Sequence, residues 1–125
     1  MFKKFVKKNS EYFYFVFRIL IGLMFFLHGF AKVQSGVFSG PSILMVAASS
    51  IELVVGLLIL LGLFIRYAAF VGAIEMVVAY FMAHSPNGLS PLANRGEAAV
   101  LFFAAFLVLI AYGAKKWALD NLFKK

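Results

Sequence analysis

Four long apolar stretches follow one another along the chain and constrain its fold more than any other feature. They cover residues 12–31, 43–65, 67–83 and 97–112. Each approaches the roughly 20 residues that an α-helix needs to cross about 30 Å of hydrocarbon. The sequence therefore predicts an all-α fold, an integral membrane four-helix bundle.

The composition excludes a soluble monomer and supports a single transmembrane domain over residues 1–125. Apolar residues make up 64% of the chain and charged residues 14%, whereas an average soluble domain has about 45–50% and about 25%. A chain this short cannot bury so much apolar surface within itself. Cysteine is absent, so thiolate-ligated zinc and iron–sulfur clusters are excluded. We expect no metal site, and any redox chemistry would depend on a bound organic cofactor or haem.

The positive charges predict the orientation of the spans. Arg66 alone separates the second apolar stretch from the third, and eight lysines flank the stretches at the two ends of the chain. Because basic residues concentrate on the cytoplasmic side, we expect both termini in the cytoplasm of a prokaryotic inner (plasma) membrane. Lys32 and Arg95 then lie outside. The eight flanking lysines are Lys3, Lys4, Lys7, Lys8, Lys115, Lys116, Lys124 and Lys125.

The same distribution of charge indicates the partners. The net charge of +7 lies beside membrane spans rather than along a groove, so we expect the lipid bilayer and no nucleic acid as a partner. Residues 115–125 alternate lysines with apolar side chains, and we interpret them as a basic amphipathic tail on the inner surface. A bundle of four spans this short is also consistent with a homo-oligomer.

Ionisable side chains inside the predicted spans are the candidate functional residues. Arg18, Glu52 and Glu75 lie deep in the first three spans, and His28 lies in the outer third of the first. A charge at the bilayer centre costs about 2.5–3.5 kcal/mol on insertion scales, so such residues normally face the bundle interior and find partners. We expect Arg18 to pair with Glu52 or Glu75. The remaining carboxyl is then protonated or hydrogen-bonded, and it is the best candidate for a proton-handling group.

Structural interpretations of these residues remain open. Arg18 could extend its long stem to the inner phosphates, or an Arg–Glu pair could serve only to fix the register of the helices. His28 could simply hydrogen-bond a backbone carbonyl. Glu97, beside Gly96, is explained by the favourable effect of a negative charge at a helix N-terminus.

Three motifs along the chain occur together in a known family. Their combination resembles the DoxX family of small four-span membrane proteins. The closing motif departs from the family pattern at Lys115, where the family has a second glycine, and at Ala118, where it has serine. The motifs are Arg18-x3-Gly22-x2-Phe25-x2-His28-Gly29-x2-Lys32, then Glu52-x3-Gly56-x5-Gly62-x3-Arg66, and the run Gly-Ala-Lys-Lys-Trp-Ala-Leu-Asp over residues 113–120.

The resemblance implies a role in membrane redox chemistry. Some members of the family look like subunits of quinone-reducing sulfur-compound oxidoreductases, and others are linked to membrane redox-stress complexes. Carried over by motif, Arg18, His28, Lys32 and Glu52 are the functional positions, and Phe25 joins them as a candidate for contact with a cofactor. Glu75 matches no family signature, so its candidacy depends on its position in the span alone.

Three functions are consistent with these residues. The first is a quinone-interacting, redox-associated subunit or accessory of a membrane oxidoreductase complex, with a soluble or membrane redox partner and with Glu52, Arg18, His28 and Glu75 as catalytic candidates. The second is a small proton-coupled transporter that uses an intramembrane glutamate. The third is a scaffold without chemistry that recruits a partner through its basic inner face. Haem ligation by His28 and His84 is a minor fourth hypothesis.

Overall fold

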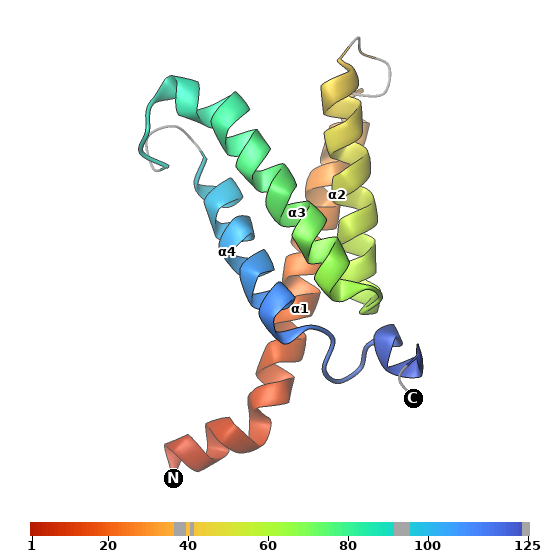
Figure 1. The fold of residues 1–125 in the computed structure, drawn as a ribbon, viewed down its shortest axis with the longest axis vertical. Helices are drawn as coiled ribbons and strands as arrows, with labels where there is room; N and C mark the ends of the chain where they lie inside the picture. Colours follow the sequence, from red (N-terminus) through yellow and green to blue (C-terminus); the bar gives the residue numbers. More distant parts are fainter. Residues whose placement is uncertain (37–39, 41, 92–95, 124–125) are drawn as a thin grey trace.

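The computed structural model describes residues 1–36, 40, 42–91 and 96–123 (Figure 1). Within these residues the chain is helical and contains no strand, so the predicted all-α class is confirmed. Arg95, Lys124 and Lys125 of the predicted topology lie outside the described residues. The elements are the α-helices α1 (Phe2–Gln34), α2 (Ile43–Leu61), α3 (Ile65–Ala79) and α4 (Glu97–Tyr112), the π-helix η2 (Tyr80–His84), and the short 3-10 helices η3 (Ser85–Asn87) and η4 (Leu119–Phe123).

Three helical segments in the described chain are long and apolar enough to cross a membrane. They are Phe2–Gln34, Ile43–Leu61 and Ile65–Asn87, the last formed by α3 together with η2 and η3. The fourth helix, α4, is equally apolar but has 16 residues. At about 1.5 Å per residue it extends about 24 Å, less than the hydrocarbon thickness of about 30 Å.

The first helix begins well before the predicted span. It starts at Phe2, because neither glycine nor proline interrupts the sequence before Gly22. Its first turns bend away from the axis of the bundle (Figure 1). Near the bend, the side chains of Asn9 and Ser10 donate hydrogen bonds back to the carbonyls of Phe5 and Lys7. Such local side-chain bonds compete with the helical ladder and bend helices.

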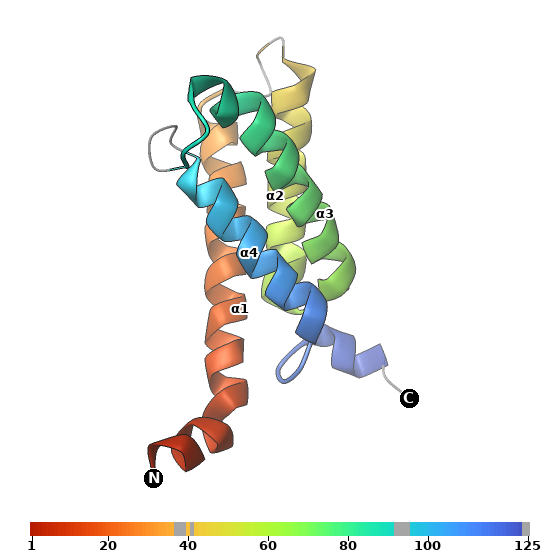
Figure 2. The same ribbon diagram turned by 60° about the vertical axis from the view of Figure 1, so that its left-hand side comes forward.

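The helices associate as two pairs, α1 with α2 and α3 with α4 (Figures 1 and 2). Glycines allow the close approach within each pair. A Cβ atom at Gly56 would lie 2.6 Å from the backbone nitrogen of Phe26, and one at Gly29 would lie 2.9 Å from the carbonyl oxygen of Ser49. In the second pair, a Cβ atom at Gly72 would lie 2.8 Å from the ring of Phe106. Small residues thus replace side-chain interdigitation where the backbones meet.

An aromatic cluster joins the two pairs. The ring centroid of Phe25 on α1 lies 5.2 Å from that of Phe102 and 4.8 Å from that of Phe106, both on α4. Phe25 and Phe106 are fully buried. The packing accounts for the position of Phe25, which sequence analysis proposed as a cofactor contact.

The hairpin between α2 and α3 turns earlier than predicted. The sequence suggested that Arg66 alone separates the two spans, but α2 ends at Leu61 and Arg66 lies in the first turn of α3. The turn is made by Gly62 (φ 74°) and Phe64 (φ 52°), both in the left-handed region. Glycine adopts this conformation without steric cost, which is why it commonly ends a helix.

Candidate functional site

A buried ion pair joins α1 to α2. The Lys32 ammonium lies 2.7 Å from Glu52 Oε1. The Glu52 side chain is 4% exposed and that of Lys32 is 30% exposed. A buried carboxylate needs a partner, since an unpaired charge in a low-dielectric interior is costly. The expectation that Arg18 neutralises Glu52 or Glu75 is therefore wrong, because Lys32 reaches down from the last turn of α1 to take that place.

A second carboxyl lies beside this pair. Glu75, on α3, is close enough to Glu52 and Lys32 for their charges to act on it. No N–H or hydroxyl donor among the described residues bonds to either of its oxygens or to Glu52 Oε2, and the Glu75 carboxyl lies within hydrogen-bonding reach of the Glu52 carboxyl. One ammonium thus faces two carboxyls. We call Lys32, Glu52 and Glu75 the carboxyl cluster.

Lys32 and Glu75 of the carboxyl cluster line a cavity of about 520 Å³ between α2 and α3, and Glu52 is not among its lining residues. This volume is within the range of about 300–1,000 Å³ that small-molecule sites occupy. Lys32, Glu75 and His84 are its polar members, and aliphatic side chains form its walls. The π-helix η2 places His84 at the cavity. Single π-helical turns occur frequently at functional sites. The apolar walls are Leu44, Met45, Ala47, Ala48 and Ile51 on α2, Val71, Ile74, Val78 and Ala79 on α3, and Met82 and Ala83 on η2.

Arg18 occupies a different place. Its side chain is 1% exposed, so it does not extend to lipid phosphates. Its guanidinium donates hydrogen bonds to the carbonyl oxygens of Leu60 (3.3 Å), Lys116 (3.2 Å) and Trp117 (2.9 Å). Within the described chain it forms no ion pair. Fourteen residues of α1, about 21 Å, separate Arg18 from Lys32, so the candidate residues divide into two distant groups.

The segment after α4 docks onto the same end of the bundle. The carboxylate of Asp120 accepts hydrogen bonds from the backbone N–H groups of Phe64 (2.7 Å) and Ile65 (3.1 Å), and it thereby caps α3. Ala118 packs against Gly62, where a Cβ atom would collide with it. We call residues 113–123, with their contacts to Gly62, Phe64 and Ile65 and their hydrogen bonds from Arg18, the C-terminal clasp.

The predicted amphipathic tail is part of the clasp. Residues 113–123 fold against the α2–α3 turn. Trp117, Leu122 and Phe123 stay exposed, so contact of these side chains with lipid remains a prediction. The role of Asp120 was not predicted from the sequence, although its place in the closing motif was a signal.

The backbone explains why the family pattern has glycine at the position of Lys115. The φ of Lys115 is 59°, in the left-handed region that glycine adopts most easily. The Lys115 ammonium lies 5.6 Å from the ring centroid of Tyr112 and 6.0 Å from that of Tyr14. These cation–π contacts offset part of the cost of that conformation.

The two histidines belong to different parts of the molecule. The ring of His28 meets that of Phe102 edge-on at 5.3 Å, between α1 and α4. His84 lines the cavity between α2 and α3, and His28 is not among its lining residues. The described residues hold no group of three or more His, Cys, Asp or Glu side chains that could bind a metal ion.

Apolar helices of membrane-spanning length, packed around buried charged groups, define a helical membrane protein. The chain belongs to the DoxX family, whose model matches residues 13–85. It is 39% identical to an uncharacterized protein of Haemophilus influenzae, over 96% of this chain and 97% of that protein. A second uncharacterized protein of the same organism is 31% identical over 59% of this chain and 49% of that protein. No solved structure matches the chain.

Proposed function

We propose that this DoxX protein is a redox-associated subunit of a membrane oxidoreductase complex and that it binds a quinone at the carboxyl cluster. The observation that carries the proposal is Glu75, a half-buried residue whose carboxyl oxygens are shielded from solvent and accept no hydrogen bond from an N–H or hydroxyl donor among the described residues, on the wall of an apolar cavity. An apolar site with a few convergent polar groups is typical of small-molecule binding. A flat, uncharged quinone ring suits such a site.

The cluster suits quinone reduction because that reaction consumes protons. Two electrons from the redox partner and two protons convert the two quinone carbonyls into hydroxyls. Glu75 would hold a proton at the cavity wall and donate it to a quinone oxygen, acting as a general acid. Lys32 is held in place by its hydrogen bond to Glu52. Its remaining N–H groups would donate hydrogen bonds to a quinone carbonyl oxygen. The separation of Arg18 from the cluster favours a positioning role for that residue.

We also propose that α4 is the fourth span and that both termini are cytoplasmic, in a bacterial plasma membrane. The start of α1 and η4 lie at the same end of the molecule (Figure 2), and the sequence beside both is rich in lysine. Basic residues prefer the cytoplasmic side. Lys32 lies near the C-terminal end of α1 and His84 at the C-terminal end of η2, and both helical segments then start on the cytoplasmic side. The cavity therefore lies in the half of the bundle away from the cytoplasm.

Proton-coupled transport is the second candidate, and Glu75 also favours it. An embedded carboxyl beside an open cavity could exchange a proton for a cationic substrate. The Lys32 ammonium in the same cavity weakens a cation site by charge repulsion, so we rank transport below quinone binding.

The test compares Glu75→Gln with the matched control Glu97→Gln, which changes an exposed glutamate in the first turn of α4. Quinone binding and proton-coupled uptake of cations are measured in lipid nanodiscs and proteoliposomes respectively. We expect native protein and the control to bind quinone, and Glu75→Gln to lose most of the binding while it remains folded. Uptake that depends on Glu75, without quinone binding, would instead establish the transporter.

A further inference from the structure

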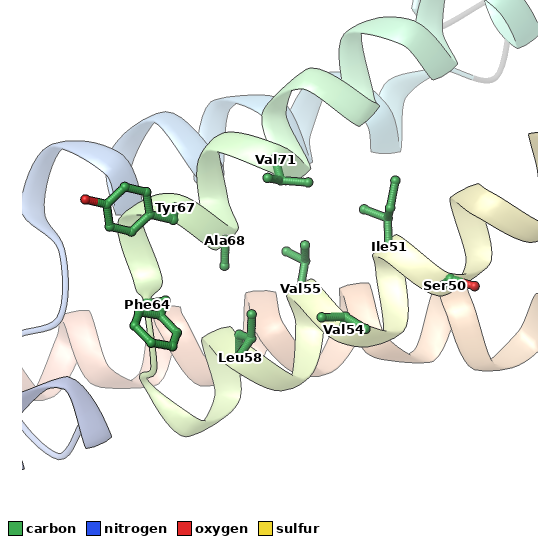
Figure 3. A pocket seen from close by; sticks show the side chains of 9 residues that line it. All are labelled: Ser50, Ile51, Val54, Val55, Leu58, Phe64, Tyr67, Ala68 and Val71. Atoms are coloured by element: carbon green, nitrogen blue, oxygen red, sulfur yellow. The ribbon is translucent and has the colours of Figure 1, made fainter.

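A second hollow follows the same seam between α2 and α3, on the side of the α2–α3 turn (Figure 3). Its volume is about 650 Å³. The side chains that line it are almost all apolar, and Figure 3 shows Leu58 and Val55 of α2 facing Ala68 and Val71 of α3 across it. Its other lining residues are Ser50, Ile51, Val54, Phe64 and Tyr67.

The two hollows adjoin along the seam, because Ile51 on α2 and Val71 on α3 line both of them. We call the two together the groove; its lining extends from Lys32 and Glu75 of the carboxyl cluster to Phe64, at the α2–α3 turn. It is polar at one end and apolar over the rest of its length.

We propose that this groove binds the isoprenoid tail of the quinone whose ring lies at the carboxyl cluster. The inference builds on the proposed function and specifies its substrate class: a quinone with a long apolar tail, which reaches the site sideways from the bilayer. The tail then points toward the cytoplasmic half of the membrane and the ring toward the outer half.

The chemistry of the groove favours a hydrocarbon chain. The Ser50 hydroxyl already donates to the carbonyl of Val46 at 2.9 Å, so it does not require a polar ligand. Val54 and Tyr67 are 57% and 77% exposed at the rim, so the groove opens toward the side where the lipid lies. A lipid acyl chain would also fit these walls. The second hollow adjoins the cavity that Lys32 and Glu75 line, and this position argues for a molecule that has both a polar ring and an apolar tail.

The experiment separates the tail from the ring. Binding of two probes to the protein in nanodiscs is measured: a tail-less dimethoxy-methyl-benzoquinone, and the same ring with a long isoprenoid tail, its concentration expressed per mole of lipid. The variant Leu58→Trp fills the groove without changing the cavity at the cluster, since Leu58 lines only the second hollow. Leu57→Trp is the matched control, because Leu57 is exposed on the same helix and lines neither hollow.

We expect Leu58→Trp to raise the Kd of the tailed quinone about tenfold, which corresponds to the loss of roughly two buried methylene groups. The Kd of the tail-less quinone should stay unchanged, and Leu57→Trp should change neither value. A tailed quinone with a photoreactive group on the tail should label peptides of α2 and α3 that line the groove. The photolabel uses the native chain, so it decides the question even where Leu58→Trp fails to fold.

Other outcomes overturn the inference in distinguishable ways. Labelling of other faces, or equal Kd values of the tailed quinone for Leu58→Trp and native protein, would exclude the groove as the tail site while binding of the tail-less ring still supported the proposed function. Equal labelling by a photoreactive phospholipid that quinone does not displace would assign the groove to lipid. If neither quinone binds the native protein, both the proposed function and this inference fail.

Discussion

The Lys32 ammonium and the Glu52 carboxylate, 2.7 Å apart, join α1 to α2 at the wall of the candidate site. The bond has a chemical consequence beyond packing. Because Lys32 is bonded to Glu52, the neighbouring Glu75 forms no ion pair among the described residues, and the carboxyl with which it can share a proton is that of Glu52. The pair therefore joins the two helices and leaves Glu75, the carboxyl that we propose to carry protons, without an ion-pair partner in the described chain.

The pair can be tested by a double-mutant cycle. We expect Lys32→Met to reduce the free energy of unfolding by about 3–5 kcal/mol, because it leaves the buried Glu52 charge unpaired. Glu52→Met should cost less, since Lys32 is 30% exposed and can turn to Glu75. The double variant should recover most of the loss. Unfolding in mixed detergent micelles measures all four proteins, and additive effects of the two substitutions would contradict the ion pair.

The positions of these charged residues on their helices could be predicted from the sequence. Arg18, Gly22, Phe25, Gly29 and Lys32 have the spacing of one stripe on a helix; the first four are the buried residues of α1, and the Lys32 side chain is 30% exposed. A period of 3.6 residues is a local property, so the sequence reveals it.

The partners of the charges could not be predicted in the same way. The predicted depths of Arg18 and of the glutamates in the membrane are similar, and this similarity suggested that they pair. Depth along a span says how far a side chain lies from the membrane boundary and does not say which group it contacts. The actual acceptors are backbone carbonyls, of Leu60 and of a segment 98 and 99 residues away in sequence. Backbone groups are present at every residue and leave no trace in sequence composition. The fold of the chain after α4, and the clasp that it forms, became visible only in three dimensions.

Removal of Arg18 should loosen the C-terminal clasp and leave the carboxyl cluster intact. Arg18→Met leaves three carbonyl oxygens without their donor, and a buried unsatisfied group costs about 1–3 kcal/mol. We expect trypsin to cleave after Lys115 and Lys116 many times faster than in native protein. Arg66→Met, which removes an exposed arginine with one long hydrogen bond of 3.3 Å to Ala111, is the control. Quinone binding that falls in parallel with clasp opening would show that the two ends of the bundle are coupled.

The glycine contacts within the first helix pair predict a large effect from a small change. Gly56→Ala places a methyl group 2.6 Å from the backbone of Phe26, so one helix must move away from the other. Overpacking of this kind costs about 1–3 kcal/mol, and we expect the upper part of this range because backbone atoms cannot rotate aside. The neighbouring Leu57→Ala changes an exposed residue and should shift stability by less than about 1 kcal/mol, since lipid is as apolar as leucine. Equal thermal stability of Gly56→Ala and native protein in detergent would refute the close packing.

Lys115 and Trp117 share a left-handed backbone, with φ values of 59° and 53°, but replacement by glycine should affect them differently. Relief of the conformation favours glycine by about 1–2 kcal/mol, whereas the greater freedom of glycine in the unfolded chain opposes this by about 0.5–1 kcal/mol. At Lys115 the loss of exposed cation–π contacts, about 0.5–1 kcal/mol, brings the total near zero, so we expect a change within about 1 kcal/mol. Trp117 contacts the rings of Tyr12 and Phe15 at centroid distances of 5.0 Å each, and each aromatic pair contributes about 0.5–1.5 kcal/mol. Trp117→Gly should therefore be clearly destabilising. Thermal unfolding of the two variants, measured side by side, checks the difference, and an equal loss in both would mean that the ring contacts of Trp117 contribute nothing to the clasp.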